Sequence, residues 1–423
     1  MQGYRPRIID RTLADYLQGL PAVCIDGAKG VGKTSSAQQI CATEIHMDNK
    51  LVQDILNVSS QLIKEASKPV LIDEWQLLPH VWDYVRRLVD ENNSPGQYVL
   101  TGSAYPKKAN VHSGAARIVH LRMRPLSIEE RQIDSPVVRI KDLLNREPLE
   151  ISGSTDVTID DYLYEISQSG FPAINQLSAT NARRQLDGYI DNIVEREFEN
   201  LGYSVRNSDA LRNWLASYAA AQGTTATYAT ILDAASPGQS NKPSAKTTQN
   251  YRDVLSRLWL IDDVEPWLPI ASQFKYLGKT PKHFLVDPAL SMRLLNLEPN
   301  SFINSDLSSS FDAKGKTMLG RFFEALIAQS LKTYAQANDA TLHHFRSSNG
   351  AREIDFIIQR ARQLVLIEVK LAGSVEASDL RHLHWFESEF PEYAVAKCVI
   401  NAGSYAYTRG DGVHVIPAAL LGA

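Results

Sequence analysis

The segment 27–34 constrains this chain most, because it reads Gly-Ala-Lys-Gly-Val-Gly-Lys-Thr. The pattern G-x-x-x-x-G-K-T is typical of the phosphate-binding loop of nucleoside triphosphatases. An apolar run, 22–25, precedes it and a helix-like run, 35–40, follows it. This context predicts a buried strand that leads through the loop into the N-terminus of a helix, where backbone N–H groups face a bound phosphate.

The residue types of the loop predict separate roles in binding a nucleotide. Lys33 would neutralise the β- and γ-phosphates, and the Thr34 hydroxyl would ligate Mg²⁺. The nucleotide-binding residues are predicted to be Gly27, Ala28, Lys29, Gly30, Val31, Gly32, Lys33, Thr34 and Ser35. A chance glycine turn is the alternative, and the flanking strand and helix argue against it.

A second motif, 68–74, is an apolar strand that ends in two acids, Asp73 and Glu74. A buried strand that carries an aspartate to the edge of the phosphate-binding loop is how such folds hold Mg²⁺. We therefore predict that Asp73 binds Mg²⁺ through water and that Glu74 is the general base for the attacking water. An acidic turn after a strand is common by itself, so this prediction depends on the first motif.

Polar residues also follow a third apolar strand, 97–100. In an open α/β sheet, the carboxyl ends of the strands form the ligand-binding edge. Thr101 or Ser103 is therefore a candidate to sense the γ-phosphate and orient the water, although Ser103 could instead cap a helix. Arg117 is a candidate arginine finger or sensor, although a lone arginine is more often a surface residue.

Length, charge and cysteine usage limit the class of protein. With 423 residues the chain is too long for one core, so two or three domains are expected. A net charge of -4 excludes a globally basic nucleic-acid binder and leaves a local basic patch open. The three cysteines are far apart and predict a reducing, cytoplasmic location. No apolar run is long enough to span a membrane, and the N-terminus lacks a signal segment.

The order of strands and helices predicts an α/β fold of four parts. Residues 1–150 alternate between the two and predict a parallel-sheet P-loop core with strands at 22–25, 44–48, 69–73, 97–101 and 118–122. The segment 151–204 is predicted to be a helical lid, broken at 169–172. The segment 205–285 is predicted to be a winged-helix-like module, and 286–423 a C-terminal α/β domain.

Within the middle segment, 245–261 resembles the second half of a helix-turn-helix, and 264–285 is expected to supply a β-wing. Lys246 and Arg252 are candidates for phosphate contacts with DNA. Winged helices also serve as plain packing modules, and few cations cluster here, so both readings stay open.

The last third of the chain contains a second constellation of charged residues. Asp355 and Glu368 fall on adjacent strands, with Lys370 on the same face as Glu368, and Glu324 lies on an upstream helix. Two carboxylates would hold Mg²⁺ or Mn²⁺, and the lysine would activate water for phosphodiester cleavage. This D-x₁₂-E-x-K arrangement, over about 315–400, resembles the restriction-endonuclease-like superfamily. A salt-bridged strand pair in a nuclease-like fold without cleavage is the alternative.

The whole chain resembles a family of bacterial and archaeal AAA-like ATPases whose C-terminal domain has no assigned function. The matching stretches are 4–10, 27–34, 71–76 with 82–83, 100–104, 112–117, 124–127, 287–288, 323–324, 354–355 and 367–370. One departure is Ala116, where relatives tend to have glycine. The resemblance implies an ATP-binding core, a winged-helix-like middle and a nuclease-like end.

Three hypotheses about function remain open at this stage. The first is an ATPase that hydrolyses ATP with Mg²⁺ to drive conformational change of the appended domains. The second is an ATP-regulated, metal-dependent DNA nuclease. The third is a slowly hydrolysing, nucleotide-dependent switch that binds a partner. The prediction that the nucleotide is ATP or ADP and not a guanine nucleotide depends on the resemblance alone. An arginine finger that acts between copies of the chain would imply a homo-oligomer.

Overall fold

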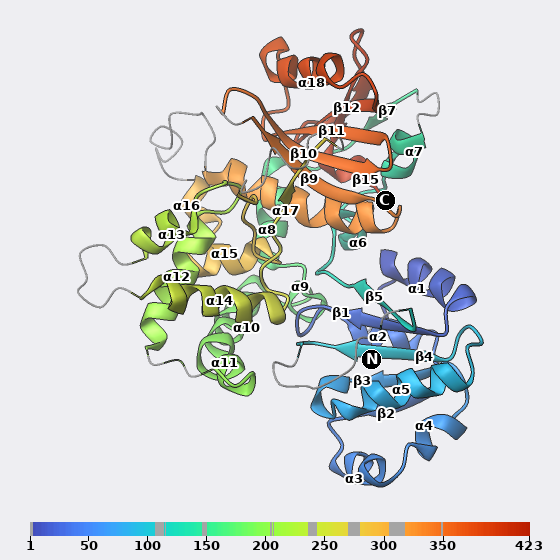
Figure 1. Ribbon diagram of the computed structural model, residues 1–423. Helices are drawn as coiled ribbons and strands as arrows, with labels where there is room; N and C mark the ends of the chain where they lie inside the picture. The colour runs from blue at the N-terminus through green and yellow to red at the C-terminus, as the bar shows by residue number, and fades with distance from the viewer. Residues whose placement is uncertain are drawn as a thin grey trace. The chain divides into compact units, whose positions relative to one another are not determined.

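The computed structural model describes residues 3–105, 114, 116–145, 150–203, 205, 207–235, 243–269, 280–303, 318–347 and 350–423 (Figure 1). They form two compact units. The first unit comprises Met1–Arg124, Arg196–Ser204 and Asn250–Leu260, and the second comprises Pro125–Glu195, Val205–Gln249 and Ile261–Ala423. Of the stretches named above, residues 112–113 and 115 and the segment 270–279 of the expected wing lie outside the described residues.

The first unit is built on a parallel sheet with the strand order β2-β3-β4-β1-β5. Its strands are β1 (Ala22–Asp26), β2 (Thr43–His46), β3 (Val70–Asp73), β4 (Tyr98–Gly102) and β5 (Ile118–Arg122). The predicted strands are confirmed to within two residues. The inner strands β3, β4 and β1 are mostly apolar because strands inside a parallel sheet are buried on both faces, whereas the edge strands β2 and β5 are partly exposed and carry polar residues.

Helices accompany this sheet: α1 (Ile8–Gly19), α2 (Lys33–Gln38), α3 (Lys50–Val58), α4 (Gln61–Glu65) and α5 (His80–Glu91), with the short turn η1 (Trp75–Leu77). On α5, the apolar side chains of Trp82, Val85 and Leu88 are buried and pack into one cluster with Ala22 and Cys24 of β1. The end of α14 (Ala245–Arg257) and the short helix α11 (Phe198–Asn200) also belong to this unit.

The second unit is built on an eight-stranded sheet with the order β7-β13-β14-β12-β11-β10-β9-β8. Its strands are β7 (Ser152–Ser154), β8 (Glu265–Pro266), β9 (Thr341–Arg346), β10 (Glu353–Arg360), β11 (Gln363–Lys370), β12 (Ala394–Asn401), β13 (Tyr405–Thr408) and β14 (Val413–Pro417). The predicted pair of adjacent strands is confirmed, since β10 and β11 are antiparallel with Phe356 opposite Ile367. A separate small pair joins β6 (Val138–Arg139) to β15 (Leu421–Gly422).

The helices of the second unit are α6 (Ile128–Arg131), α7 (Ile140–Asn145), α8 (Ile159–Gln168), α9 (Pro172–Asn175), α10 (Ala179–Asn192), α12 (Ser208–Ala220), α13 (Tyr228–Ala234), α15 (Pro288–Leu294), α16 (Asn300–Ile303), α17 (Met318–Gln336) and α18 (Ala377–Glu389). The break expected at 169–172 is present, and Asp287 stabilises it: its carboxylate accepts from Gly170 N at 2.7 Å and from Ser169 Oγ at 3.0 Å. The same carboxylate caps α15 through Ala289 N, at 2.8 Å.

Two details of the expected organisation differ in the structure. The segment 151–204 is not wholly helical, because β7 pairs with β13 at one edge of the large sheet. The sequence Ser-Gly-Ser has little intrinsic preference for a strand, so pairing with a neighbour decides its conformation. The segment expected to supply a wing does form antiparallel bridges, Ile261 with Leu285 and Val264 with Lys282, and β8 then joins the large sheet beside β9.

Candidate nucleotide-binding site

The loop between β1 and α2 has the backbone that its glycines allow. Gly30 and Gly32 have φ of 86° and 103°, a region that side chains disfavour. Gly27 is required for a different reason, since a Cβ there would lie 2.2 Å from the Met123 carbonyl oxygen. The sequence therefore turns sharply at the carboxyl edge of the sheet, and its N–H groups are available at the start of α2.

Lys33 lies within this loop and is almost fully buried. Its Nζ donates to the carbonyl oxygens of Gly27 at 2.8 Å and Ala28 at 3.1 Å. Burial lowers the pKa of the ammonium, and the negative charges of Glu74, Asp26 and Asp73 partly oppose that shift. The two hydrogen bonds therefore hold the Lys33 ammonium within the phosphate-binding loop.

Three predicted residues, Thr34, Asp73 and Thr101, meet at the carboxyl ends of β3 and β4. The Thr34 hydroxyl donates to Asp73 Oδ1 at 2.7 Å, and the Thr101 hydroxyl donates to the same oxygen at 2.6 Å. Carboxylate and hydroxyl oxygens are the hard donors that Mg²⁺ prefers, so Thr34 and Asp73 fit this ion. The Asp73 carboxylate also meets a residue that the sequence did not single out, His46 of β2, whose Nδ1 lies 3.2 Å from Oδ2.

The charge of His46 depends on two opposing influences. Burial by itself would lower the pKa of the imidazole, but hydrogen bonds and charge attraction from Asp73 and Glu44 outweigh it and raise the pKa. A single histidine at the end of a short strand has no distinctive spacing, which is why the sequence did not reveal it.

Glu74 is held in a specific orientation beside this group. Its backbone is left-handed, with φ 55°, and its N–H donates to Thr101 Oγ1 at 3.1 Å. Its carboxylate oxygen Oε2 accepts from the Ser103 hydroxyl at 2.6 Å and from the Gln76 side-chain amide. Ser103 therefore contacts the predicted base, and Gln76 is a further residue of the site that sequence reasoning missed.

Arg117, the candidate arginine finger or sensor, lies away from the phosphate-binding loop of its own chain. In the register of β1 with β5, Ala22 pairs with Ile118 and Asp26 with Arg122, so Arg117 lies at the amino edge of the sheet. The phosphate-binding loop begins at the opposite edge, about 16 Å away for a strand of this length. Arg117 Nε instead donates to Asp90 on α5 at 2.7 Å. The preceding residue, Ala116, has φ 63°, the conformation that glycine in its place would adopt freely.

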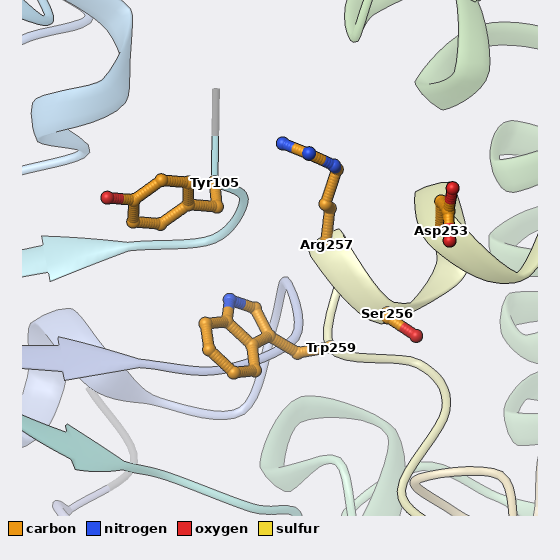
Figure 2. Close-up of a pocket in the computed structure, with 5 residues that line it drawn as sticks. All are labelled: Tyr105, Asp253, Ser256, Arg257 and Trp259. Atoms are coloured by element: carbon orange, nitrogen blue, oxygen red, sulfur yellow. The ribbon is translucent and has the colours of Figure 1, made fainter. Parts of the chain in front are cut away.

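A pocket of about 520 Å³ lies in the same unit, lined by Tyr105, Asp253, Ser256, Arg257 and Trp259 (Figure 2). The Tyr105 N–H donates to the Arg257 carbonyl oxygen at 3.2 Å, which joins the end of the β4 strand segment to the end of α14. The pocket combines two aromatic rings with a guanidinium, a set that suits a planar group carrying hydrogen-bond acceptors. No spacing pattern in the sequence connects these residues.

The C-terminal constellation lies in the second unit. Glu324 and Asp355 are buried there, and both form ion pairs with a lysine that the sequence did not single out, Lys282. Lys370 Nζ lies 3.1 Å from Glu368 Oε1 and 3.2 Å from Asp379 Oδ1. Burial alone would lower the pKa of Lys370, but Glu368 and Asp379 raise it. Each predicted acid is therefore close to a lysine of the chain.

Among the described residues, one group of three side chains has metal-ligand atoms within 4.8 Å of one another: Cys24, Asp26 and His120. These residues are joined by hydrogen bonds, since Cys24 donates to Asp26 Oδ1 at 3.5 Å and His120 Nδ1 lies 2.6 Å from Asp26 Oδ2. Among the described residues, Glu324, Asp355 and Glu368 do not form such a group.

The parallel sheet, the glycine-rich loop and the Thr34–Asp73 contact together define a P-loop NTPase-like protein. Comparison with known families agrees, because residues 20–132 match the family described as AAA domain. Residues 159–301 and 319–421 match two further families, each described as a domain of unknown function (DUF8612 and DUF4143). The AAA match supports ATP binding by the first unit. In the described part of the chain, no helix has the length and apolar character needed to cross a bilayer.

Relatives cover most of the chain at low identity. Uncharacterised proteins of Mycobacterium bovis and Mycobacterium tuberculosis are each 22% identical over 410 residues, which covers 95% of this chain and 81% of each relative. Among solved structures, a Walker-type ATPase of Pyrococcus abyssi is 15% identical with a TM-score of 0.38, covering 67% of this chain and 94% of that one. Drosophila ORC bound to DNA is 13% identical with a TM-score of 0.23, covering 68% and 95%.

Proposed function

We propose that the chain hydrolyses ATP with Mg²⁺ and that its nucleotide state changes the conformation of the second unit. The observation that carries this proposal is the convergence of the Thr34 and Thr101 hydroxyls on Asp73 Oδ1, beside a buried Lys33. Mg²⁺, held by Thr34 and by Asp73 through water, would neutralise charge on the β- and γ-phosphates. Lys33 would exchange its two loop carbonyls for phosphate oxygens.

In the proposed reaction, Glu74 accepts a proton from water while the water oxygen forms a bond to the γ-phosphorus. The bond from that phosphorus to the bridging oxygen breaks, and the products are ADP and inorganic phosphate. Ser103 and Gln76 hold the Glu74 carboxylate, so these two side chains act as positioning residues. Arg117 is not part of this proposed machinery, because it lies at the other edge of the sheet.

The test is ATP turnover and ATP binding in three proteins: wild type, Lys33→Ala and Glu74→Gln. We expect Lys33→Ala to lose ATP binding, and Glu74→Gln to retain it while turnover falls by roughly 10²- to 10⁴-fold, the usual contribution of a general base. Unchanged turnover in Glu74→Gln would remove Glu74 from this role. Tight binding of ATP by wild type with negligible turnover would instead favour the slowly hydrolysing, partner-binding switch.

The remaining alternative, an ATP-regulated nuclease, requires a metal at Glu324, Asp355 and Glu368. We do not adopt it, because Lys282 already neutralises two of these three acids.

A further inference from the structure

The cluster of Lys282, Glu324 and Asp355 is enclosed within the second unit. The three side chains are only 1% to 2% exposed. Lys282 comes from the segment that bridges Val264, Glu324 from α17 and Asp355 from β10. Three elements that are distant in sequence therefore bring one cation and two anions to a single interior position.

The Lys282 ammonium contacts both carboxylates of the cluster and lies over an aromatic ring. Lys282 Nζ pairs with Glu324 Oε1 and lies 3.1 Å from Asp355 Oδ1. The ring of Phe356 lies beneath it, with its centroid 5.1 Å from Nζ. A lysine in this setting serves both carboxylates at once, and removing it would take an opposite charge away from two buried acids.

The far oxygens of the two acids are also approached by backbone. Asp355 Oδ2 accepts from Val369 N at 3.0 Å. Beside Glu324, Gly223 has φ 69°, and a Cβ built there would lie 3.3 Å from Oε2, so the main chain passes close to this carboxylate. The main chain therefore lies close to both acids on the side away from the ammonium.

From these contacts we infer that Lys282 is the permanent counter-ion of the Glu324–Asp355 pair and stands where a nuclease of this architecture would hold a divalent metal. The predicted metal ligands do not fit a metal in this chain, since an ammonium bridges them. Lys370 likewise serves two acids, because its ammonium contacts Asp379 of α18 as well as Glu368. At the described residues of this cluster, lysines rather than a divalent metal are therefore the counter-ions of the predicted metal ligands.

The test compares Mn²⁺ uptake by the full chain without nucleotide, measured from the electron paramagnetic resonance signal of free Mn²⁺. The proteins are wild type, Asp355→Asn, Lys282→Ala and the double variant Lys282→Ala/Asp355→Asn. All four retain the P-loop, so any Mn²⁺ bound there cancels in the comparison. We expect wild type and Asp355→Asn to bind equally, and Lys282→Ala to bind one additional Mn²⁺ per chain that the double variant loses.

A matched control is Lys332→Ala, which removes another buried lysine of the same unit, one that pairs with Asp262 at 2.9 Å. Mn²⁺ should raise the unfolding midpoint of Lys282→Ala and leave that of Lys332→Ala unchanged.

Two results would overturn the inference: one Mn²⁺ more in wild type than in Asp355→Asn, or no additional Mn²⁺ in a folded Lys282→Ala. If Lys282→Ala does not fold, the comparison of wild type with Asp355→Asn still decides between a lysine-filled and a metal-filled site.

Discussion

The hydroxyls of Thr101 and Thr34 donate to the same oxygen of Asp73, at 2.6 and 2.7 Å, although Thr101 lies on β4 and Thr34 on α2. Thr101 also accepts from the backbone N–H of Glu74, at 3.1 Å. One threonine at the end of β4 therefore connects the proposed Mg²⁺ residue to the proposed base.

Replacing Thr101 with valine keeps the shape of the side chain and removes both hydrogen bonds. A hydrogen bond to a charged group contributes about 1.5–3 kcal/mol, so we expect ATP turnover to fall by roughly tenfold to a hundredfold. The measurement is kcat and KM for ATP hydrolysis beside Thr101→Ser, which retains the hydroxyl and should stay near wild type. Equal turnover in Thr101→Val and wild type would show that the shared oxygen is not used.

Ser103 provides a second test, because it contacts the Glu74 carboxylate at 2.6 Å. We expect Ser103→Ala to lower kcat about fivefold, the effect of losing roughly one hydrogen bond, while KM stays constant. The same substitution in a Glu74→Gln background should cause no further loss, because residues that act as a unit are not additive. Independent, multiplying effects of the two substitutions would contradict a positioning role for Ser103.

The first unit could be predicted from sequence because its signals are local. Three of the five strands, β1, β3 and β4, are mostly apolar and buried along their whole length, and the residues at 27–34 fix the turn that follows β1. The buried cluster of Lys282, Glu324 and Asp355 could be predicted only in part. The D-x₁₂-E-x-K spacing located Asp355, but Lys282 lies 73 residues before it, and no periodic pattern connects a lysine to acids at that separation.

The pairing of β5 explains why Arg117 lies away from the loop. The sequence shows that Arg117 precedes the apolar run 118–122, but its edge of the sheet depends on whether that run pairs parallel or antiparallel with β1. The parallel pairing of Ala22 with Ile118 places Arg117 at the amino edge of the sheet, away from the phosphate-binding loop.

Arg117→Ala should therefore leave ATP turnover unchanged at low protein concentration. The ion pair with Asp90 is more than a third exposed on each side, so its loss should reduce the free energy of unfolding by no more than about 0.5 kcal/mol. A contrasting variant is Arg7→Ala, since Arg7 Nη1 donates to the loop carbonyl of Val31 at 2.7 Å and should be needed for ATP binding. A loss of turnover in Arg117→Ala that depends on protein concentration would instead assign Arg117 to the site of a second copy.

His120 makes the stability of the first unit depend on pH. Its hydrogen bond to Asp26 raises the pKa of the imidazole; burial opposes this shift, and the charge of Asp26 adds to it. The groups that face the ring are Asp26 and Cys24 of β1 and, stacked on it at 5.6 Å, Trp82 of α5.

Because the folded pKa lies above the unfolded value of about 6.5, the ion pair contributes fully below that pH and is lost as pH rises through the folded pKa. Urea unfolding of wild type and His120→Asn, from about pH 6 to about pH 9, measures this contribution. We expect the difference in free energy of unfolding between the two proteins to shrink as pH rises. The ring is nearly half exposed, so solvent screening keeps the effect small. A difference that stays constant across this range, or that grows toward alkaline pH, would show that the charged imidazole does not stabilise the fold.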